Sequence, residues 1–207
     1  MAGIIEVKDQ GKVRIYDADN SNYVDIVVPS TVSSNRTITL PDASFTVPQA
    51  DTVGGITMAQ QWRITTNLAG NADPISANLE IVDTDGYASI GSNMTESSGT
   101  FTFPSTGIYK IEFNAMQHVD TGADYVNIII KTTTDNSSYS AAATSSANSD
   151  GTATAFSSCM ASFIFDVTNT STHKVRFEVV QANTGNDLVG HSSQNKTYFT
   201  FIRLGDT

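Results

Sequence analysis

The chain has 207 residues, of which 39% are hydrophobic and 15% are charged, so uncharged polar residues and glycine must supply most of its surface. Such a surface suits strands and turns better than helices. The formal net charge is −10, from 11 Lys and Arg against 21 Asp and Glu. This balance argues against nucleic acid as a partner, because neutralising phosphates needs clustered basic residues.

The cysteine content and the apolar pattern of the sequence exclude further classes of protein. The single cysteine, Cys159, rules out an intrachain disulfide framework, and its apolar neighbours favour a small buried side chain over a nucleophile. No apolar stretch approaches the ~18 residues that a membrane-spanning helix needs. We recognise no signal peptide either. We therefore expect a protein that is made in a cytoplasm and is not inserted in a membrane.

Residues 12–47 contain short apolar runs, each closed by Asp, Asn, Ser or Pro: KVRIYD, YVDIVVP, RTITLPD and ASFTV. Such runs predict a β-meander of three or four strands, which we assign to an N-terminal module at residues 1–50. A meander of this size buries little apolar area by itself. We expect it to pack against a neighbouring copy or a larger assembly.

A second domain is predicted after a linker at residues 51–61, where Pro, Gly-Gly and small polar residues gather. From Trp62 onward, period-two alternation recurs between turn residues. The predicted strands are WRITTNL, LEIVDT, YASIG, GTFTFP, GIYKIEFNAMQHV, DYVNIIIKTTT, TATAFSSCMASFIFDV, HKVRFEVVQA and TYFTFIRL. Strands repeating in this way are typical of a β-sandwich or barrel at residues 62–207.

Residues 135–151, DNSSYSAAATSSANSDG, stand apart because they are small and polar without periodic apolar positions. We interpret them as a mobile surface loop. The alternative is a short edge strand that packs against another subunit.

Two segments carry a resemblance to a known family. The first, GTFTFPSTGIYKIEF at residues 99–113, resembles the central hairpin of C1q and tumour-necrosis-factor-like jelly rolls. The second, the aromatic final strand TYFTFIRL, is similar to that family's closing, core-facing strand. The resemblance covers residues 60–206 and implies a jelly-roll β-sandwich that assembles as a homotrimer. The fold class expected is therefore all-β, with a small N-terminal β-meander before the jelly roll.

The phrase NRTITLPD, preceded by VDIVVP, resembles a repeat of tail-fibre and other appendage proteins of bacteriophages, especially marine ones. That resemblance implies an N-terminal module that anchors the chain to a virion. The sequence has neither a collagen-like Gly-x-y stalk nor a coiled coil. We therefore expect a compact knob or a capsid decoration rather than a long fibre.

Catalytic and metal-binding patterns are absent from the sequence: no nucleophile elbow, P-loop or His-Glu-x-x-His motif is present. We therefore predict that the protein is not an enzyme and has no cofactor. The acidic pairs near Asp17 and Asp83 lack the spacing of calcium loops, so we interpret them as turns, with Gly86 at positive φ. Because some C1q-like trimers bind calcium near their axis, the resemblance makes Asp120 and Asp124 candidate calcium ligands.

Three tyrosines are candidate ligand-binding residues, because an aromatic ring stacks on a sugar while nearby Asn and Asp side chains hydrogen-bond its hydroxyls. They are Tyr87, Tyr125 and Tyr139. For each of them, packing in the core or in an interface is the alternative.

The function predicted from the sequence is a non-enzymatic bacteriophage virion structural protein, a capsid decoration or fibre knob exposed on the particle as a homotrimer. Its partners are other virion proteins, of capsid or tail, bound through residues 1–50. The alternative is a host-surface adhesin that binds a glycan. A bacterial secreted C1q-like protein and a depolymerase are more distant alternatives.

Overall fold

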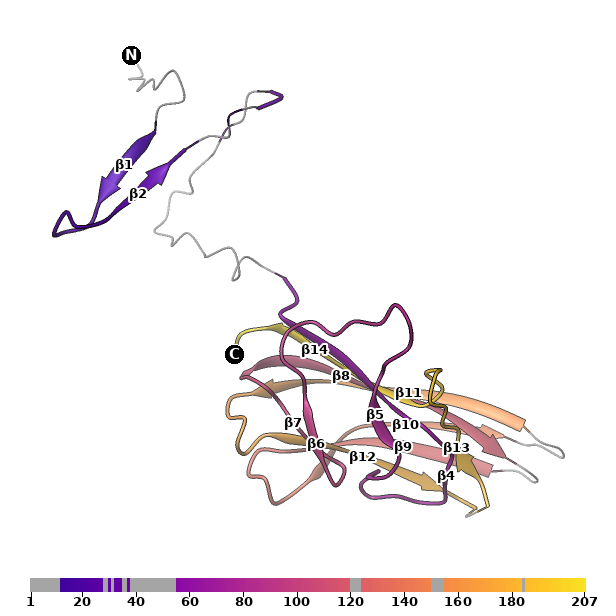
Figure 1. The fold of residues 1–207 in the computed structure, drawn as a ribbon. Coiled ribbons are helices and arrows are strands. Elements are labelled where there is room, and N and C mark those ends of the chain that lie inside the picture. The colour runs from indigo at the N-terminus through magenta and orange to yellow at the C-terminus, as the bar shows by residue number, and fades with distance from the viewer. Residues whose placement is uncertain are drawn as a thin grey trace. The chain divides into compact units, whose positions relative to one another are not determined.

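The structure is a computed structural model that describes residues 12–27, 30, 32–34, 37, 55–119, 124–149, 155–183 and 185–207. The chain divides into two compact units, Met1–Asp51 and Thr52–Thr207. Every regular element among the described residues is a β-strand (Figure 1). The all-β fold class is therefore confirmed.

The first unit contains a two-stranded antiparallel hairpin, β1 (Val13–Tyr16) and β2 (Tyr23–Ile26). Its turn is closed by Asp17, whose carboxylate accepts a hydrogen bond from the Asn22 backbone N–H at 3.2 Å. Asn20 takes a φ of 60°, which Asn tolerates better than most residues. The acidic pair in this segment is thus a turn, as predicted. The strands expected at residues 36–47 lie, Thr37 excepted, outside the described residues.

The second unit is built from strands β3 to β14. Their bounds are β3 Met58–Ile64, β4 Leu68–Ala69, β5 Leu79–Ile81, β6 Thr95–Ser97, β7 Thr100–Thr102, β8 Gly107–Val119, β9 Asp124–Thr133, β10 Ser140–Ser149, β11 Ala155–Val167, β12 Lys174–Gln181, β13 Asp187–Leu188 and β14 Tyr198–Gly205.

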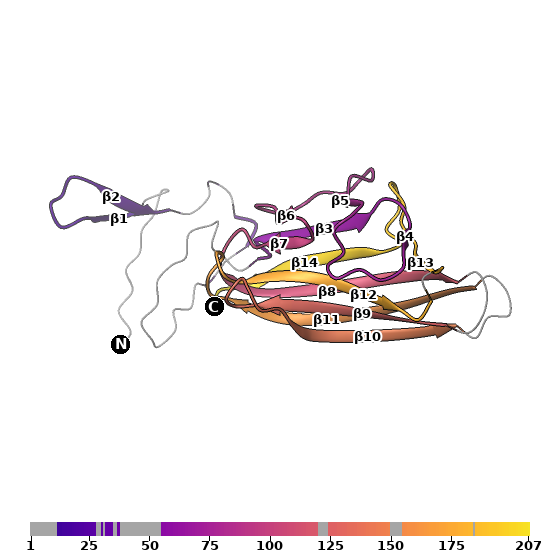
Figure 2. The ribbon, with the colours of Figure 1, turned by 90° about the horizontal axis from the view of Figure 1, so that it is seen from below.

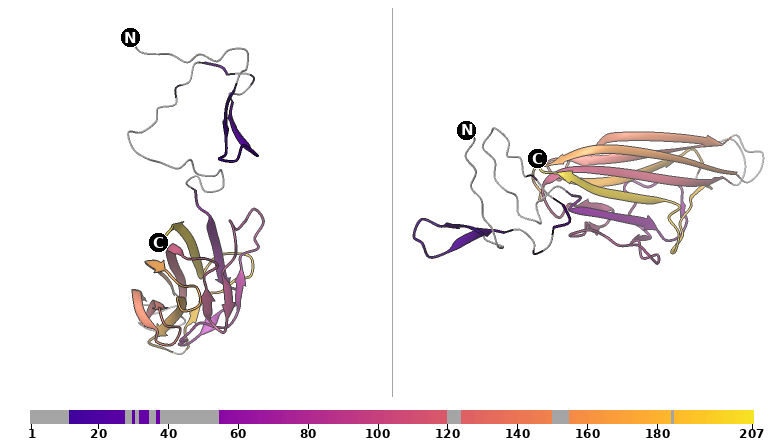
Figure 3. Two further views of the ribbon diagram at one scale, coloured as in Figure 1. Left: turned by 90° about the vertical axis from the view of Figure 1, so that its left-hand side faces the viewer. Right: turned by 90° about the horizontal axis from the view of Figure 1, so that it is seen from above.

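These strands form two antiparallel sheets that face each other (Figures 1 and 2). One sheet has the order β10-β9-β12-β7-β6. The other has the order β4-β13-β8-β14-β3-β5, and β11 pairs with β8 along its full length. The left view of Figure 3 looks along the strands and shows the two layers of the sandwich. We call the second sheet the β8 sheet.

Strict alternation along β8 explains why it lies in the middle of its sheet. Its odd-numbered residues, among them Tyr109, Ile111 and Phe113, are fully buried, whereas its even-numbered residues are half-buried. β14, which lies between β3 and β8, likewise buries Phe199 and Phe201. The prediction that the final strand is central and faces the core is confirmed.

An aromatic cluster joins the two sheets. Phe101 and Phe177 project from β7 and β12, and both are completely buried. The Phe101 ring packs edge-on against Trp62 of β3 at 5.3 Å between centroids. The Phe177 ring stacks on Phe199 of β14 at 4.1 Å. Contacts of this kind add ~0.5–1.5 kcal/mol per pair beyond the burial of apolar area.

The prediction of a hairpin at residues 99–113 is wrong. β7 pairs with β6 and β12, whereas β8 pairs with β11, β13 and β14, so the turn between β7 and β8 carries the chain from one sheet to the other. Phe103 and Tyr109 flank this turn, and their ring centroids lie 4.7 Å apart. The aromatic residues on both sides of the turn thus meet in the core between the sheets.

Three further expectations need correction. The first strand of the sandwich begins at Met58, not at Trp62. The segment YASIG is not a strand, although Ile90 forms an isolated bridge with Ala59. The loop expected at residues 135–151 instead contains β10, an edge strand paired with β9. Its small side chains suffice because backbone hydrogen bonds hold it to β9, while Ala143 and Ala147 pack on the core.

Candidate functional site

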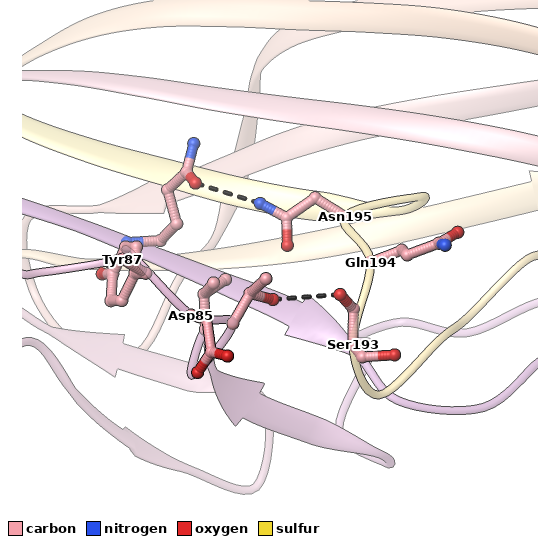
Figure 4. Close-up of a pocket in the computed structure, with 8 residues that line it drawn as sticks. Asp85, Tyr87, Ser193, Gln194 and Asn195 are labelled. Carbon is pink, nitrogen blue, oxygen red and sulfur yellow. Dashed lines mark hydrogen bonds between the residues drawn. The ribbon is translucent and has the colours of Figure 1, made fainter.

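A cleft of about 400 Å³ opens beside β3 and β14 of the β8 sheet. One wall is the loop after β5 and the other is the loop before β14. The cleft is lined by Gln61, Val82, Thr84, Asp85, Tyr87, Ser193, Gln194 and Asn195. Figure 4 shows Asp85 and Tyr87 on one side, and Ser193, Gln194 and Asn195 on the other.

The first wall is shaped by a turn at Gly86. This glycine has a φ of +85°, a conformation that side-chain-bearing residues rarely adopt, which confirms the sequence prediction for this position. The turn is closed by a hydrogen bond of 2.9 Å from the Tyr87 backbone N–H to the Thr84 carbonyl. Tyr87 is thereby placed beside β3, where its hydroxyl accepts a hydrogen bond from the Gln61 backbone N–H at 2.8 Å.

The floor of the cleft includes Gln61, whose side chain lies on the outer face of the β8 sheet. Its Nε2 donates to the Thr200 hydroxyl of β14 at 3.1 Å. Its Oε1 accepts from the Asn195 Nδ2 at 3.0 Å (Figure 4). Gln61 thus links both walls of the cleft to the sheet.

The two walls are also tied together by Arg63, whose side chain is 0% exposed although it too lies on the outer face of the sheet. Arg63 donates to Glu80 at 2.7 Å and to the Thr84 hydroxyl at 2.7 Å, both in the segment around the first wall. It also donates to the Asp83 carboxylate and to the Ser192 carbonyl of the second wall.

A direct bond from the Thr84 hydroxyl to the Ser193 carbonyl, 3.0 Å long, completes the link between the walls (Figure 4). A buried guanidinium with several hydrogen bonds holds its partners in one geometry. The walls of the cleft are thus cross-linked before any ligand arrives.

The polar groups left over in the cleft are mostly acceptors. Within the part of the chain that the structure describes, no hydrogen bond or ion pair involves the Asp85 carboxylate, the Gln194 side chain or the Asn195 Oδ1. The Arg63 charge is already matched by Glu80 and Asp83. Asp85 therefore leaves the cleft with a negative charge.

Of the three tyrosines predicted from the sequence, Tyr87 lines this cleft. Tyr139 is half-buried and lies under the Arg176 guanidinium, 3.8 Å from it, which is a packing role. Tyr125 is exposed on β9. Because Ser140 pairs with Thr132 whereas Asn148 pairs with Tyr125, Tyr125 and Tyr139 lie at opposite ends of the β9–β10 ladder. The structure does not gather the three tyrosines into one site.

Calcium binding by Asp120 and Asp124 stays a prediction. Asp120 lies outside the described residues, and Asp124 is described only as the first backbone position of β9. Over the described ranges, no three His, Cys, Asp or Glu side chains are grouped so that they would hold a metal ion.

Cys159 is half-buried on β11, and burial raises the pKa of its thiol to about 11. At neutral pH the thiol is therefore protonated, and a protonated thiol is a poor nucleophile. This agrees with its interpretation as a small hydrophobic side chain.

Helices long and apolar enough to cross a bilayer do not occur in the described residues.

No protein-family model matches the sequence, and no curated protein is similar enough to match. Solved structures do share the fold. Eiger TNF from S. frugiperda superposes with a TM-score of 0.52, at 13% identity, over 74% of this chain and 96% of that chain. Murine APRIL at pH 8.5 gives a TM-score of 0.50, at 12% identity, over 71% of this chain and 98% of that chain. The sandwich is a TNF-like jelly roll. At such identities the likeness shows the fold alone.

Sequence reasoning missed Gln61, Arg63 and Asn195. A charged residue inside the apolar run WRI was the available signal for Arg63, because a buried arginine needs acidic partners. Nothing in the local sequence pairs Gln61 with Asn195, which lies 134 positions further along the chain.

The clamp formed by Arg63 generates a stability prediction. Replacing the residue, Arg63→Met, keeps most of the buried volume but removes every hydrogen bond between the guanidinium and the two walls. We expect a loss of about 1–3 kcal/mol in the free energy of unfolding, because the acidic partners left behind are partly exposed. Urea unfolding at one fixed protein concentration measures it.

Asp83→Asn is the matched control, because the Asp83 side chain is 75% exposed. It should cost less than ~1 kcal/mol. Equal losses in the two variants would contradict the role of Arg63 as the clamp.

Proposed function

We propose that this protein is a non-enzymatic bacteriophage virion structural protein, a capsid decoration or fibre knob, made in the host cytoplasm and exposed on the particle as a homotrimer. The observation that carries the assembly is a row of apolar side chains on the outer face of the β8 sheet. Phe156, Met160 and Ile164 of β11 are 58%, 54% and 60% exposed. Large apolar side chains gathered on one surface mark an interaction site.

The neighbouring strand β8 lies beside these apolar residues and places mostly polar side chains opposite them. Each exposed residue of β11 lies opposite an even-numbered residue of β8, so Phe156 pairs with His118 and Met160 with Asn114. The rings of Phe156 and His118 lie 5.0 Å apart. Ser158 and Ser162 separate the apolar residues, and such small side chains allow a second surface to approach closely. We call Phe156, Met160 and Ile164 the β11 row.

A second copy of the chain is the occupant that fits this face best. The resemblance to C1q and TNF-like jelly rolls implies homotrimers, and the fold supports that expectation. Two charges beside the β11 row are already matched, since Lys110 forms an ion pair with Glu112 at 2.7 Å. The exposed Asp166 adds a single carboxylate at the end of the row, so among the described residues the face is mainly apolar and offers a basic partner little charge to recognise.

Oligomeric state tests this proposal directly. Light scattering coupled to size exclusion should give about 66 kDa for the full-length protein, three times the chain mass of 22.1 kDa. The variant Ile164→Asp places a carboxylate in every copy of the interface and should give the mass of a single chain. A monomeric unaltered protein, or a trimeric Ile164→Asp variant, would show that the β11 row is not the interface.

Attachment to the particle is assigned to the N-terminal module. Its hairpin has one wholly apolar face, because Val13 pairs with Ile26 and Ile15 pairs with Val24. These four side chains are between 47% and 67% exposed. An apolar face of this kind on a two-stranded hairpin needs a partner surface to be stable.

The opposite face of the hairpin is polar and internally matched. Arg14 donates to Asp25 at 2.7 Å and its guanidinium lies 3.6 Å from the centre of the Tyr23 ring. The Arg14 side chain holds the pKa of Asp25 well below its usual range. The asymmetry between the two faces supports docking through the apolar face. The resemblance of NRTITLPD to phage appendage repeats supports another virion protein as the partner.

Particle decoration separates attachment from assembly. Removing residues 1–50, or replacing Ile15→Asp alone, should leave a trimer of unchanged mass that no longer binds virions lacking the protein. Co-sedimentation with such particles measures the binding. If both variants still bound particles, the assignment of particle attachment to the N-terminal unit would be wrong. The Ile164→Asp and Ile15→Asp variants serve as controls for each other, since each should lose one property and keep the other.

The second candidate function is a host-surface adhesin that binds a glycan. The observation in its favour is the cleft around Tyr87, with its ring, amides and carboxylate. Labelled full-length protein should then bind host cells and their purified polysaccharides in a pull-down. Absence of binding to both would exclude this function and leave the structural one untouched.

A further inference from the structure

We infer that the cleft lined by Gln61, Asp85, Tyr87 and Asn195 is a saccharide-binding site that selects neutral or amino sugars and rejects acidic ones. This inference rests on the adhesin function proposed above, and adds to it the site and the chemical class of the ligand. The cleft has a volume of about 400 Å³, which falls within the ~300–1,000 Å³ of small-molecule sites and is enough for one or two sugar rings.

An oriented aromatic ring is the first requirement of such a site. Tyr87 is half-buried and lines the cleft. Its position is set at both ends, by the backbone bond to Thr84 at 2.9 Å and by the hydroxyl that accepts from Gln61 at 2.8 Å. Val82, which is 5% exposed, adds apolar surface to the same cleft. A fixed ring stacks on the C–H face of a pyranose without losing side-chain entropy on binding.

Free hydrogen-bond acceptors are the second requirement. The Asp85 carboxylate and the Asn195 Oδ1 belong to different walls of the cleft (Figure 4). An ionised carboxylate accepts several hydrogen bonds and donates none, so it recognises a ligand rich in O–H or N–H donors. The hydroxyls of a sugar, or the ammonium of an amino sugar, supply such donors. Gln194 adds an amide that both donates and accepts.

Charge decides between classes of sugar. Asp85 is the one charged side chain among the eight that line the cleft. Arg63 lies next to the cleft, but it is buried and its charge is matched by Glu80 and Asp83. Among the described residues that line the cleft, a uronic acid or a sulfated sugar therefore meets a carboxylate and no cation. Neutral sugars avoid this repulsion, and amino sugars gain an attraction.

Preorganisation is the third requirement, and the clamp supplies it. Arg63 joins both walls, and the Asn195 Nδ2 and the Thr84 hydroxyl add further cross-links at 3.0 Å each. Neither wall needs to be ordered by the ligand, so less of the interaction free energy is lost on binding. Hydrogen bonds hold the two walls together while the open acceptors in the cleft keep no partner among the described residues. This arrangement distinguishes the cleft from an accidental gap between loops.

Ligand-observed NMR with the full-length protein tests the inference. The probes are methyl glucoside and methyl galactoside as neutral sugars, glucosamine as the amino sugar and glucuronic acid as the acidic one. We expect binding of at least one neutral sugar or of glucosamine, and binding of glucuronic acid weaker by about tenfold or more. No binding of the first three probes at millimolar concentration, or a preference for glucuronic acid, would overturn the inference.

Two variants locate the site. Tyr87→Ala should abolish saccharide binding, while Tyr125→Ala, which alters an exposed tyrosine on β9, should leave it unchanged. Because Tyr87→Ala removes a hydrogen bond to β3, circular dichroism must first show that the variant is folded. Asp85→Asn changes an exposed side chain that has no partner within the described part of the chain, and it is the safer variant for the fold. It should reduce the preference for glucosamine over glucuronic acid by about tenfold. An unchanged preference would overturn the role of Asp85.

The same samples separate this inference from the functions on which it depends. Host-cell binding that survives Tyr87→Ala would overturn the cleft as the site while the adhesin function stands. Loss of host-cell binding in Tyr87→Ala, with the trimer mass and particle decoration unchanged, would support both. Saccharides immobilised on beads test whether the site binds the terminal sugar of a polysaccharide or only a free monosaccharide. A site that binds chain ends retains the protein on the beads.

Discussion

The contact between the two sheets at Phe101 and Phe177 is the constraint on which the rest of the structure depends. Phe101 packs on Trp62 and Phe177 stacks on Phe199, so two strands of each sheet are fixed by the same rings. Among them, β3 and β14 carry Gln61 and Thr200 on their other faces. The aromatic core therefore sets the floor of the cleft without contributing an atom to it.

The alternation of side chains in a strand links the core to the outer face of the sheet, because burying one set of side chains commits the other set to the opposite face. On β11 the inward set includes Phe165 and Val167, and the outward set includes the β11 row. On β3 the inward set includes Trp62, whereas Arg63 points outward and is buried by two loops. The outer face of one sheet thus carries an apolar row at one edge and a closed polar network near the other.

Sequence reasoning succeeded where periodicity is long and failed where contacts are remote. The bounds of β8 were predicted as observed, since thirteen alternating residues leave no other register. β10 was given only as the alternative to a loop, because its Ser and Ala residues pair through the backbone and show no apolar period. The hairpin at residues 99–113 was wrong because adjacency in the chain suggests pairing, while the core requires Phe101 and Tyr109 on opposite sheets. Tyr87 was found as an aromatic residue in a turn, but its partner loop is fixed only by long-range contacts.

The net charge of the chain limits the cleft around Tyr87 and the β11 row in the same way. A chain with a formal charge of −10 is repelled by anionic surfaces at long range, so any adhesion must come from short-range contacts. The cleft around Tyr87 fits this condition, because ring stacking and neutral hydroxyls need no opposite charge. The β11 row fits it too, since its apolar residues lie beside an ion pair that is already matched. The positive charge of Arg63 is used inside the structure, where it holds the walls of the cleft.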